Sequence, residues 1–301
     1  MNFKEVLNLA NPNDSLSVGY TVSRFPDGQQ SIALTGDGRG NFSYLIDKEI
    51  TIVSRLNSFL DLEIILCATQ ALKETGAGKI NLYIPYCIGG RSDRKFNEGG
   101  FNYIKTVIAP IINSQGYAWV KVLDPHSDVL EACINNFYKI DNFRLVDEAL
   151  SYLIADDGED QIVLVSPDAG AYKKVFDVAK EFKIEKIITA SKVRDLKTGQ
   201  ILRTEIPTLD QHNDLKYVIV DDICDGGRTF IELAKVIKDS RPTAEVYLIV
   251  THGIFSSGFA ELGKYFNGIY CTNSVKDIVN DLADTDIERE MKAKVKQLNI
   301  F

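Results

Sequence analysis

Two adjacent aspartates followed by a loop of small residues combine the residue types best suited to chemistry. The apolar, β-branched run Tyr217–Val220 predicts a buried strand, and Asp221 and Asp222 follow it directly. Glycine lets backbone N–H groups approach an anion, and a helix N-terminus favours negative charge. Carboxylates accept hydrogen bonds from hydroxyl groups. The stretch therefore predicts a site for a phosphorylated sugar, and Thr229 is expected to cap the helix that follows. A plain surface turn is the alternative. The loop residues are Asp225, Gly226, Gly227, Arg228 and Thr229.

Strand and helix patterns alternate along the chain. The strands are predicted at Thr51–Val53, Ile80–Ile84, Val120–Leu123, Ile162–Val165, Tyr217–Val220 and Val246–Val250. The helices are predicted at Asp61–Thr75, Tyr103–Ser114, Asp128–Phe137, Tyr172–Phe182, Thr229–Ser240 and Ser257–Tyr265. Apolar runs without a polar face are typical of buried parallel strands. We therefore expect an α/β fold with parallel sheets flanked by helices, in which ligands bind beyond the carboxyl ends of strands.

A polar stretch divides the chain into two predicted domains. Asn142–Asp147 is the predicted seam, which gives an N-terminal domain over residues 1–145 and a C-terminal domain over residues 146–301. The charged tail Asp284–Leu298 is predicted as one amphipathic helix that packs back on the first domain.

Composition limits the classes of function. The chain has 301 residues, 45% of them hydrophobic, and a net charge of −8. An acidic protein is poorly suited to non-specific nucleic-acid binding, which depends on neutralising phosphates. The five cysteines have no CxxC spacing, which favours reduced thiols. The sequence has no apparent signal peptide and no long apolar run, so we expect a cytoplasmic protein without a membrane partner. The acidic charge argues against a nucleic-acid partner.

The stretch from Tyr217 to Phe230 resembles the signature loop of proteins that bind phosphoribosyl pyrophosphate. The resemblance implies that the acidic residues hold the ribose hydroxyls and that the loop holds the 5-phosphate. Most members have Asp-Thr-Gly-Gly-Thr where this chain has Asp-Gly-Gly-Arg-Thr. Arg228 then either points to solvent or meets a second phosphate attached to the first.

Two segments resemble the ATP- and metal-binding segments of the ribose-phosphate pyrophosphokinase family. Pro85–Lys95 is similar to the segment that contacts ATP, with Ser92 in place of a usual Gln. Asp124–Asp128 is similar to a segment whose histidine, here His126, binds magnesium. The candidate ATP-binding residues in the first segment are Arg91, Ser92, Arg94 and Lys95.

Two further segments complete the resemblance to the catalytic machinery of the same family. Val165–Gly170 is similar to a turn whose Asp, here Asp168, binds the metal. Ala190–Arg194 resembles the catalytic loop, in which Lys192 and Arg194 would stabilise the transferring group.

The resemblance extends to both ends of this region. Arg24–Gln29 is similar to a loop that reaches the ATP site of a neighbouring subunit, which implies a homo-oligomer, a dimer or larger. Its candidate residues are Phe25, Asp27 and Gln29, the last in place of a usual Glu. Thr251–Ser256 also matches the family.

The resemblance implies two phosphoribosyltransferase-like domains and a Mg²⁺-dependent transfer of the ATP diphosphate to the C1 hydroxyl of ribose 5-phosphate, with release of AMP. ADP-ribose, the acceptor of some phage-encoded relatives that serve NAD recovery, is the alternative acceptor. A phosphoribosyltransferase or a catalytically silent regulatory homologue would also be compatible with the sugar-binding loop. Replacing Asp221 and Asp222 with Asn is expected to abolish turnover and preserve the fold.

Overall fold

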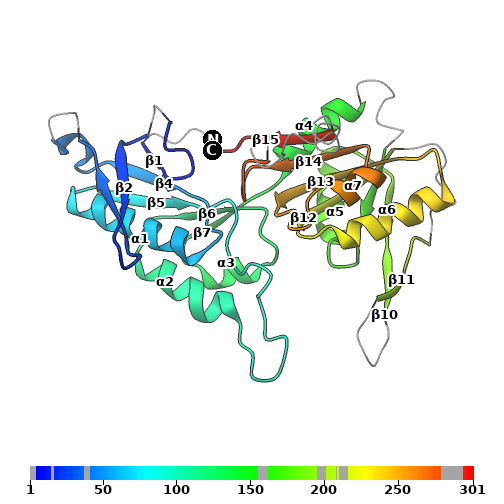
Figure 1. Ribbon diagram of the computed structural model, residues 1–301, viewed down its shortest axis with the longest axis horizontal. Helices are drawn as coiled ribbons and strands as arrows, with labels where there is room; N and C mark the ends of the chain where they lie inside the picture. The colour runs from blue at the N-terminus through cyan, green and yellow to red at the C-terminus, as the bar shows by residue number, and fades with distance from the viewer. Residues whose placement is uncertain are drawn as a thin grey trace. The chain divides into compact units, whose positions relative to one another are not determined.

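The computed structural model describes residues 5–14, 17–36, 41–154, 162–194, 201–207, 209, 216–278 and 294–301, with the backbone alone described at 192–194 and 201–204. The chain forms two compact units (Figure 1). Unit 1 comprises Met1–Asp141 with Ile300–Phe301, and unit 2 comprises Asn142–Asn299.

Unit 1 is built on a five-stranded parallel sheet in the order β1-β4-β5-β6-β7. Its strands are β1 (Val6–Asn8), β4 (Glu49–Val53), β5 (Lys79–Tyr83), β6 (Val120–Leu123) and β7 (Phe137–Ile140). Its helices are a 3₁₀ turn (Ser43–Leu45), α1 (Phe59–Glu74), a π-helix (Ile104–Ile108) that continues into α2 (Ala109–Ser114), and α3 (Val129–Cys133). α1 begins at a capping box, in which Ser58 and Asp61 each satisfy a backbone N–H group of the other.

An antiparallel hairpin, β2 (Tyr20–Arg24) and β3 (Gln30–Leu34), is attached to unit 1. It lies against α1, where the Gln30 amide donates a hydrogen bond of 2.7 Å to the Leu60 carbonyl. The hairpin turn, residues 25–29, is thereby held on a helix rather than left as an unsupported loop.

Unit 2 is built on a six-stranded parallel sheet in the order β15-β14-β13-β12-β8-β9. Its strands are β8 (Ile162–Ser166), β9 (Ile187–Thr189), β12 (Lys216–Cys224), β13 (Glu245–Gly253), β14 (Gly268–Thr272) and β15 (Val295–Leu298). Its helices are α4 (Phe143–Ile154), α5 (Tyr172–Glu181), α6 (Arg228–Ser240) and α7 (Ala260–Tyr265). A separate antiparallel ribbon consists of β10 (Ser191–Arg194) and β11 (Ile201–Glu205).

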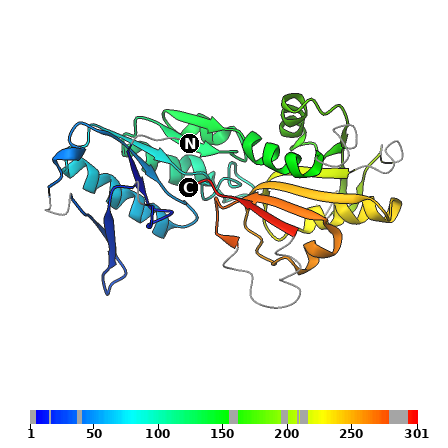
Figure 2. The same cartoon turned by 90° about the horizontal axis from the view of Figure 1, so that it is seen from above.

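The helices of unit 2 cover both faces of the sheet (Figure 2). The apolar side chains of α6 pack with Tyr217 and Ile219 of β12 in one core cluster. Side chains of neighbouring residues point to opposite faces of a strand, and the Asp222 side chain meets α5 on the other face. The two helices therefore lie on opposite faces, as right-handed crossovers in opposite directions require.

The predicted α/β class is confirmed, while several predicted elements differ from the structure. The helix predicted over Asp128–Phe137 ends at Cys133, because Asn136 adopts a positive φ of 53° and Phe137 begins β7. The end of the charged tail, Val295–Leu298, is not helical: it forms β15, parallel to β14. Residues 279–293 of that tail lie outside the described residues. Most of the stretch predicted as the seam, Asn142–Asp147, belongs to α4, which begins at Phe143.

In the part of the chain that the structure describes, no helix combines the length and apolar character that crossing a bilayer requires.

Candidate functional site

The sheet of unit 2 reverses its strand order between β8 and β12. β8 connects through α5 to β9 on one side, and β12 connects through α6 to β13 on the other side. Ligands in open α/β sheets bind in the crevice beyond the carboxyl ends of strands at such a switch point. Asp168 follows β8, and Asp221 and Asp222 lie near the carboxyl end of β12. The topology thus brings together three predicted site residues.

The aspartate pair lies inside a strand that is longer than predicted. β12 does not end at Val220 but continues to Cys224. Its pairing with β8 ends at Ile219, whereas its pairing with β13 continues to Cys224. Asp221 and Asp222 therefore remain fixed by β13 on one side and extend past the end of β8 on the other.

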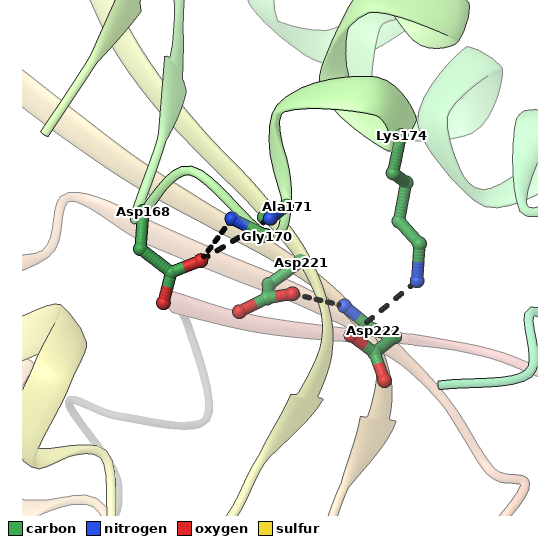
Figure 3. Close-up of polar contacts among 6 residues, drawn as sticks. All are labelled: Asp168, Gly170, Ala171, Lys174, Asp221 and Asp222. Atoms are coloured by element: carbon green, nitrogen blue, oxygen red, sulfur yellow. Dashed lines mark hydrogen bonds and ion pairs between the residues drawn. The ribbon is translucent and has the colours of Figure 1, made fainter. Parts of the chain in front are cut away.

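The two aspartates differ in their surroundings (Figure 3). The Asp222 backbone N–H donates a hydrogen bond of 2.8 Å to Oδ1 of Asp221. Burial and the neighbouring Asp222 carboxylate raise the pKa of Asp221 well above its ordinary value. Asp222 is buried, and its Oδ1 lies 3.3 Å from Nζ of Lys174 on α5. Lys174 is a site residue that the sequence analysis did not identify.

A sequence signal for Lys174 exists. It lies four residues before Val178, on the side of α5 whose apolar residues are buried, whereas the neighbouring Lys173 is exposed. A lysine on the core-facing stripe of an amphipathic helix requires a nearby anion or a route to solvent.

Asp168 forms the turn between β8 and α5. Its Oδ1 accepts hydrogen bonds from the N–H groups of Gly170 at 3.0 Å and Ala171 at 3.2 Å, and its second oxygen points away from them (Figure 3). The Ser166 hydroxyl donates to the Asp168 carbonyl. The residue has a structural role in this turn, and its carboxylate is held in one orientation at the carboxyl edge of the sheet.

The glycine-containing loop leads into α6 without a side-chain cap. The N-cap is Gly227, with a positive φ of 78°, and the helix begins at Arg228. The expectation that Thr229 caps the helix is therefore wrong, because Thr229 lies within the first turn. The first N–H groups of a helix have no partner inside it, so this loop and the start of α6 form a suitable anion-binding arrangement.

Arg228 points along the outer face of α6. Its Nε lies 2.8 Å from Oε1 of Glu232, and its side chain is 85% exposed. Of the two orientations expected for this residue, the structure shows the solvent-facing one. The orientation that would favour a second phosphate is not observed.

The segment after β13 supports the loop. The Ser256 hydroxyl donates a hydrogen bond of 2.7 Å to Oδ1 of Asp225, and the Ser256 N–H donates to the Asp225 carbonyl at 3.2 Å. A Cβ atom at Gly226 would lie 3.0 Å from Oγ of Ser257. Only glycine fits this approach without displacing the serine.

Lys192 and Arg194 lie on β10. In the ribbon, Lys192 is opposite Thr204 and Arg194 is opposite Ile201, with an irregularity between Val193 and Arg194. The ribbon extends away from the six-stranded sheet (Figure 1). The loop predicted over residues 195–200 lies outside the described residues.

The predicted ATP segment of unit 1 follows β5. Gly89 adopts a φ of 75° and lies so close to the Tyr103 ring that a Cβ atom there would be 2.3 Å from it. The Ser92 carbonyl accepts a hydrogen bond from the Tyr103 N–H at 3.1 Å. These contacts fix the segment while Arg91, Arg94 and Lys95 are exposed. The Arg94 guanidinium lies over the exposed Phe96 ring, 5.4 Å from its centroid.

His126 lies close to the carboxyl end of β6, the strand adjacent to β5. It is exposed, and two residues before it Asp124 is buried with a positive φ of 41°. The Asp124 N–H donates to the Ile140 carbonyl at 2.7 Å. In unit 1, His126 and the start of the basic segment thus follow neighbouring parallel strands.

The predicted inter-subunit loop is the turn of the β2–β3 hairpin. Gly28, at a φ of 98°, closes the turn, in which the Gln29 N–H donates to Asp27 and the Phe25 N–H donates to the Gln29 carbonyl. The Phe25 ring is 52% exposed. The aromatic ring is presented outward by a well-ordered turn.

The described residues contain no group of three or more His, Cys, Asp or Glu side chains assembled as a metal site. Mg²⁺ is usually held by one or two carboxylates together with substrate phosphates. The carboxylate of Asp168, which two backbone N–H groups hold in one orientation, has the chemistry that this mode requires.

The chain is similar in sequence to known proteins. Residues 135–283 match the phosphoribosyl transferase domain family. The chain is 27% identical to the ribose-phosphate pyrophosphokinase of Vibrio cholerae, over 93% of this chain and 83% of that protein. It is 24% identical to the ribose-phosphate pyrophosphokinase of Haemophilus influenzae, over 93% of this chain and 84% of that protein. Over most of its length, this chain is therefore similar to ribose-phosphate pyrophosphokinases.

A solved structure shares the fold. The phosphoribosylpyrophosphate synthetase of Mycobacterium smegmatis superposes with a TM-score of 0.75 at 16% identity, covering 94% of this chain and 87% of that one. The comparisons confirm the predicted resemblance to the ribose-phosphate pyrophosphokinases, and the names of these relatives agree with the predicted enzyme class, a diphosphokinase-type transferase. The relatives named here give no support to ADP-ribose as the acceptor.

Proposed function

We propose that this protein is a Mg²⁺-dependent pyrophosphokinase that transfers the β,γ-diphosphate of ATP to the C1 hydroxyl of ribose 5-phosphate and releases AMP. The observation that carries the proposal is the aspartate pair and glycine loop at the β8–β12 switch point. They occur in a chain that aligns along 93% of its length with ribose-phosphate pyrophosphokinases.

The sugar would bind in unit 2. Asp221 and Asp222 would accept hydrogen bonds from ribose hydroxyls, and the N–H groups of residues 226–229 would hold the 5-phosphate. The hydrogen bond from Ser256 to Asp225 fixes the loop for this role. Because β13 still pairs with this part of β12, the acceptors are fixed before the sugar arrives.

The nucleotide would bind through unit 1. Arg91, Arg94 and Lys95 are exposed cations in an acidic protein and suit a triphosphate. The exposed Phe25 at the hairpin turn would stack on the adenine of a neighbouring subunit, with Asp27 and Gln29 beside it. This role requires a homo-oligomer, which light scattering on the purified protein tests: a monomer at all concentrations would contradict it.

In the proposed reaction, the C1 oxygen forms a bond to the β-phosphorus of ATP. The bond from that phosphorus to the bridging α–β oxygen breaks, AMP leaves with this oxygen, and the hydroxyl proton is released. Lys192 and Arg194 would neutralise charge on the transferring diphosphate. Mg²⁺ would supply further positive charge when bound, and its candidate ligands are the phosphates, Asp168 in unit 2 and His126 in unit 1.

The test is incubation of the protein with Mg-ATP and either ribose 5-phosphate or ADP-ribose. We expect AMP and a sugar product heavier by one diphosphate with ribose 5-phosphate. Product from ADP-ribose alone would overturn the acceptor assignment. AMP from neither acceptor would overturn the proposed reaction and favour a phosphoribosyltransferase or a silent regulatory homologue.

A further inference from the structure

Lys174 is the cation of α5 that reaches into the carboxylate cluster of unit 2. Its Nζ lies 3.3 Å from Oδ1 of Asp222, and the two side chains are only 17% and 7% exposed. The lysine extends from the first turn of α5 across the end of the sheet toward β12 (Figure 3).

The burial of Lys174 argues that this contact is specific. Lysine is rarely buried unless it is paired, because removing an ammonium group from water is unfavourable. Lys173, the preceding residue, is exposed on the same helix. The Lys174 side chain could reach solvent by turning in another direction, yet in the structure it extends to Asp222.

The two neighbouring carboxylates give the Lys174 ammonium group a role in the site. Asp221 and Asp222 are consecutive, Asp222 is buried, and its carboxylate opposes the ionisation of Asp221. Lys174 offsets this repulsion, because its positive charge also lowers the pKa of Asp221. A carboxylate has about four acceptor positions, so Asp222 can keep the ion pair and also accept a hydrogen bond from a hydroxyl group.

We infer that Lys174 is a positioning residue of the sugar site, which fixes the Asp222 carboxylate as the acceptor of a ribose hydroxyl. The inference rests on the proposed function, because it names a further residue of the same site. It assigns to α5, the helix after β8, a supporting part in a site whose sugar-binding groups come from β12 and the loop that follows it.

An indirect role of Lys174 differs measurably from a direct one. If Lys174 acts through Asp222, its removal has little further effect once Asp222 has been replaced by Asn. If Lys174 instead binds the sugar phosphate itself, its removal weakens binding equally in both backgrounds.

The experiment compares wild type with Lys174→Met, Lys174→Arg, Lys173→Met, Asp222→Asn and the double variant Lys174→Met/Asp222→Asn. Calorimetry measures ribose 5-phosphate binding to each, and for the variants that retain Asp222, AMP release gives the KM values for both substrates. We expect Lys174→Met to weaken ribose 5-phosphate binding and raise its KM by about tenfold or more. The KM for ATP should change by less than about twofold, and Lys174→Arg should recover most of the loss. In the Asp222→Asn background the further loss should be below about twofold.

Lys173→Met is the matched control, since it removes the neighbouring exposed cation. Equal effects of Lys173→Met and Lys174→Met would overturn the inference, as would equal losses from Lys174→Met in both backgrounds. If Lys174→Met does not fold, the double variant, which removes both members of the ion pair, and Lys174→Arg still test the inference by calorimetry. If ribose 5-phosphate binding depends on Lys174 but no AMP is released, the proposed reaction is overturned and the inference about Lys174 stands. No binding of ribose 5-phosphate by the wild type would overturn both.

Discussion

The hydroxyl of Ser256 donates a hydrogen bond of 2.7 Å to the carboxylate of Asp225. Ser256 follows β13 and Asp225 follows β12, so the bond connects the ends of two neighbouring parallel strands. The backbone supports the same connection, because the N–H groups of Ile254 and Phe255 donate to the Cys224 carbonyl. The loop that enters α6 is therefore held by the next strand of the sheet.

Replacing Ser256 with Ala is expected to raise the KM for ribose 5-phosphate severalfold. A hydrogen bond to a charged group contributes roughly 1.5–3 kcal/mol, and exposure reduces this value. Steady-state kinetics with both substrates measures this change in KM, and Ser257→Ala is the matched control. Equal KM values for wild type and Ser256→Ala would show that the bond does not order the loop.

Asp221→Asn is expected to stabilise the ligand-free protein while it abolishes turnover. Because the pKa of Asp221 is raised in the folded state, the stability it contributes is fully present below its unfolded pKa. That stability is lost as pH rises through the folded-state pKa. At neutral pH, asparagine removes this unfavourable ionisation. Thermal unfolding at pH 7 should show a Tm gain of a few degrees, since ~1 kcal/mol corresponds to 2–4 °C in a chain of this kind.

The exposed Asp239 on α6 provides a control for Asp221→Asn, because Asp239→Asn changes the same net charge outside the site. The Tm gain of Asp221→Asn should shrink as the pH is lowered, and added ribose 5-phosphate should stabilise the wild type but not the variant. A lower Tm for Asp221→Asn at pH 7 would contradict the prediction.

Gly227→Ala is expected to destabilise the protein more than Gly258→Ala. Both glycines have a positive φ, of 78° and 68°, so alanine costs ~1–2 kcal/mol at either position. At Gly227 the new Cβ would also lie 3.0 Å from the Leu262 side chain, whereas at Gly258 it would meet open space. Urea unfolding of the two variants measures the difference, and equal losses would mean that Leu262 yields without cost.

The five cysteines are all free thiols and should react with alkylating agents at different rates. Burial raises the pKa of Cys87 and of Cys271 to about 12 and also raises that of Cys224. We expect iodoacetamide at pH 8 to label the partly exposed Cys133 first, and the three buried thiols only after denaturation. Peptide mass spectrometry resolves the order, and rapid labelling of native Cys224 would indicate that the end of β12 opens.

The central strands and the sheet edge at which the candidate site residues meet could be predicted from the sequence. Ile162–Val165 and Tyr217–Val220 are apolar on both faces, as strands between two helical layers must be. Residues that follow parallel strands meet at one edge of a sheet, which places Asp168 near Asp221 without any knowledge of the strand order.

The remaining elements depend on tertiary contacts that the sequence pattern does not contain. β15 is the edge strand of its sheet, and its Lys296 lies over the Tyr152 ring, 3.2 Å from the centroid. Alternating lysines suit an exposed strand edge, but in the sequence they resemble the charged face of a helix. The prediction that Thr229 caps α6 is wrong for a related reason. Threonine has the chemistry of a cap, but the positive φ of Gly227 determines where the helix begins.

The order of strands in unit 2 also determines when its proposed sugar site is assembled during folding. β8, α5 and β9 form one local unit, and β12, α6 and β13 form another, each from contacts that are short in sequence. Asp168 and Asp222 become neighbours only when β8 pairs with β12, across the intervening β9, β10 and β11. Such non-local pairings form late because the loop must close first. An incompletely folded chain therefore presents half of the site at most, and binding of a sugar phosphate would report complete folding of this unit.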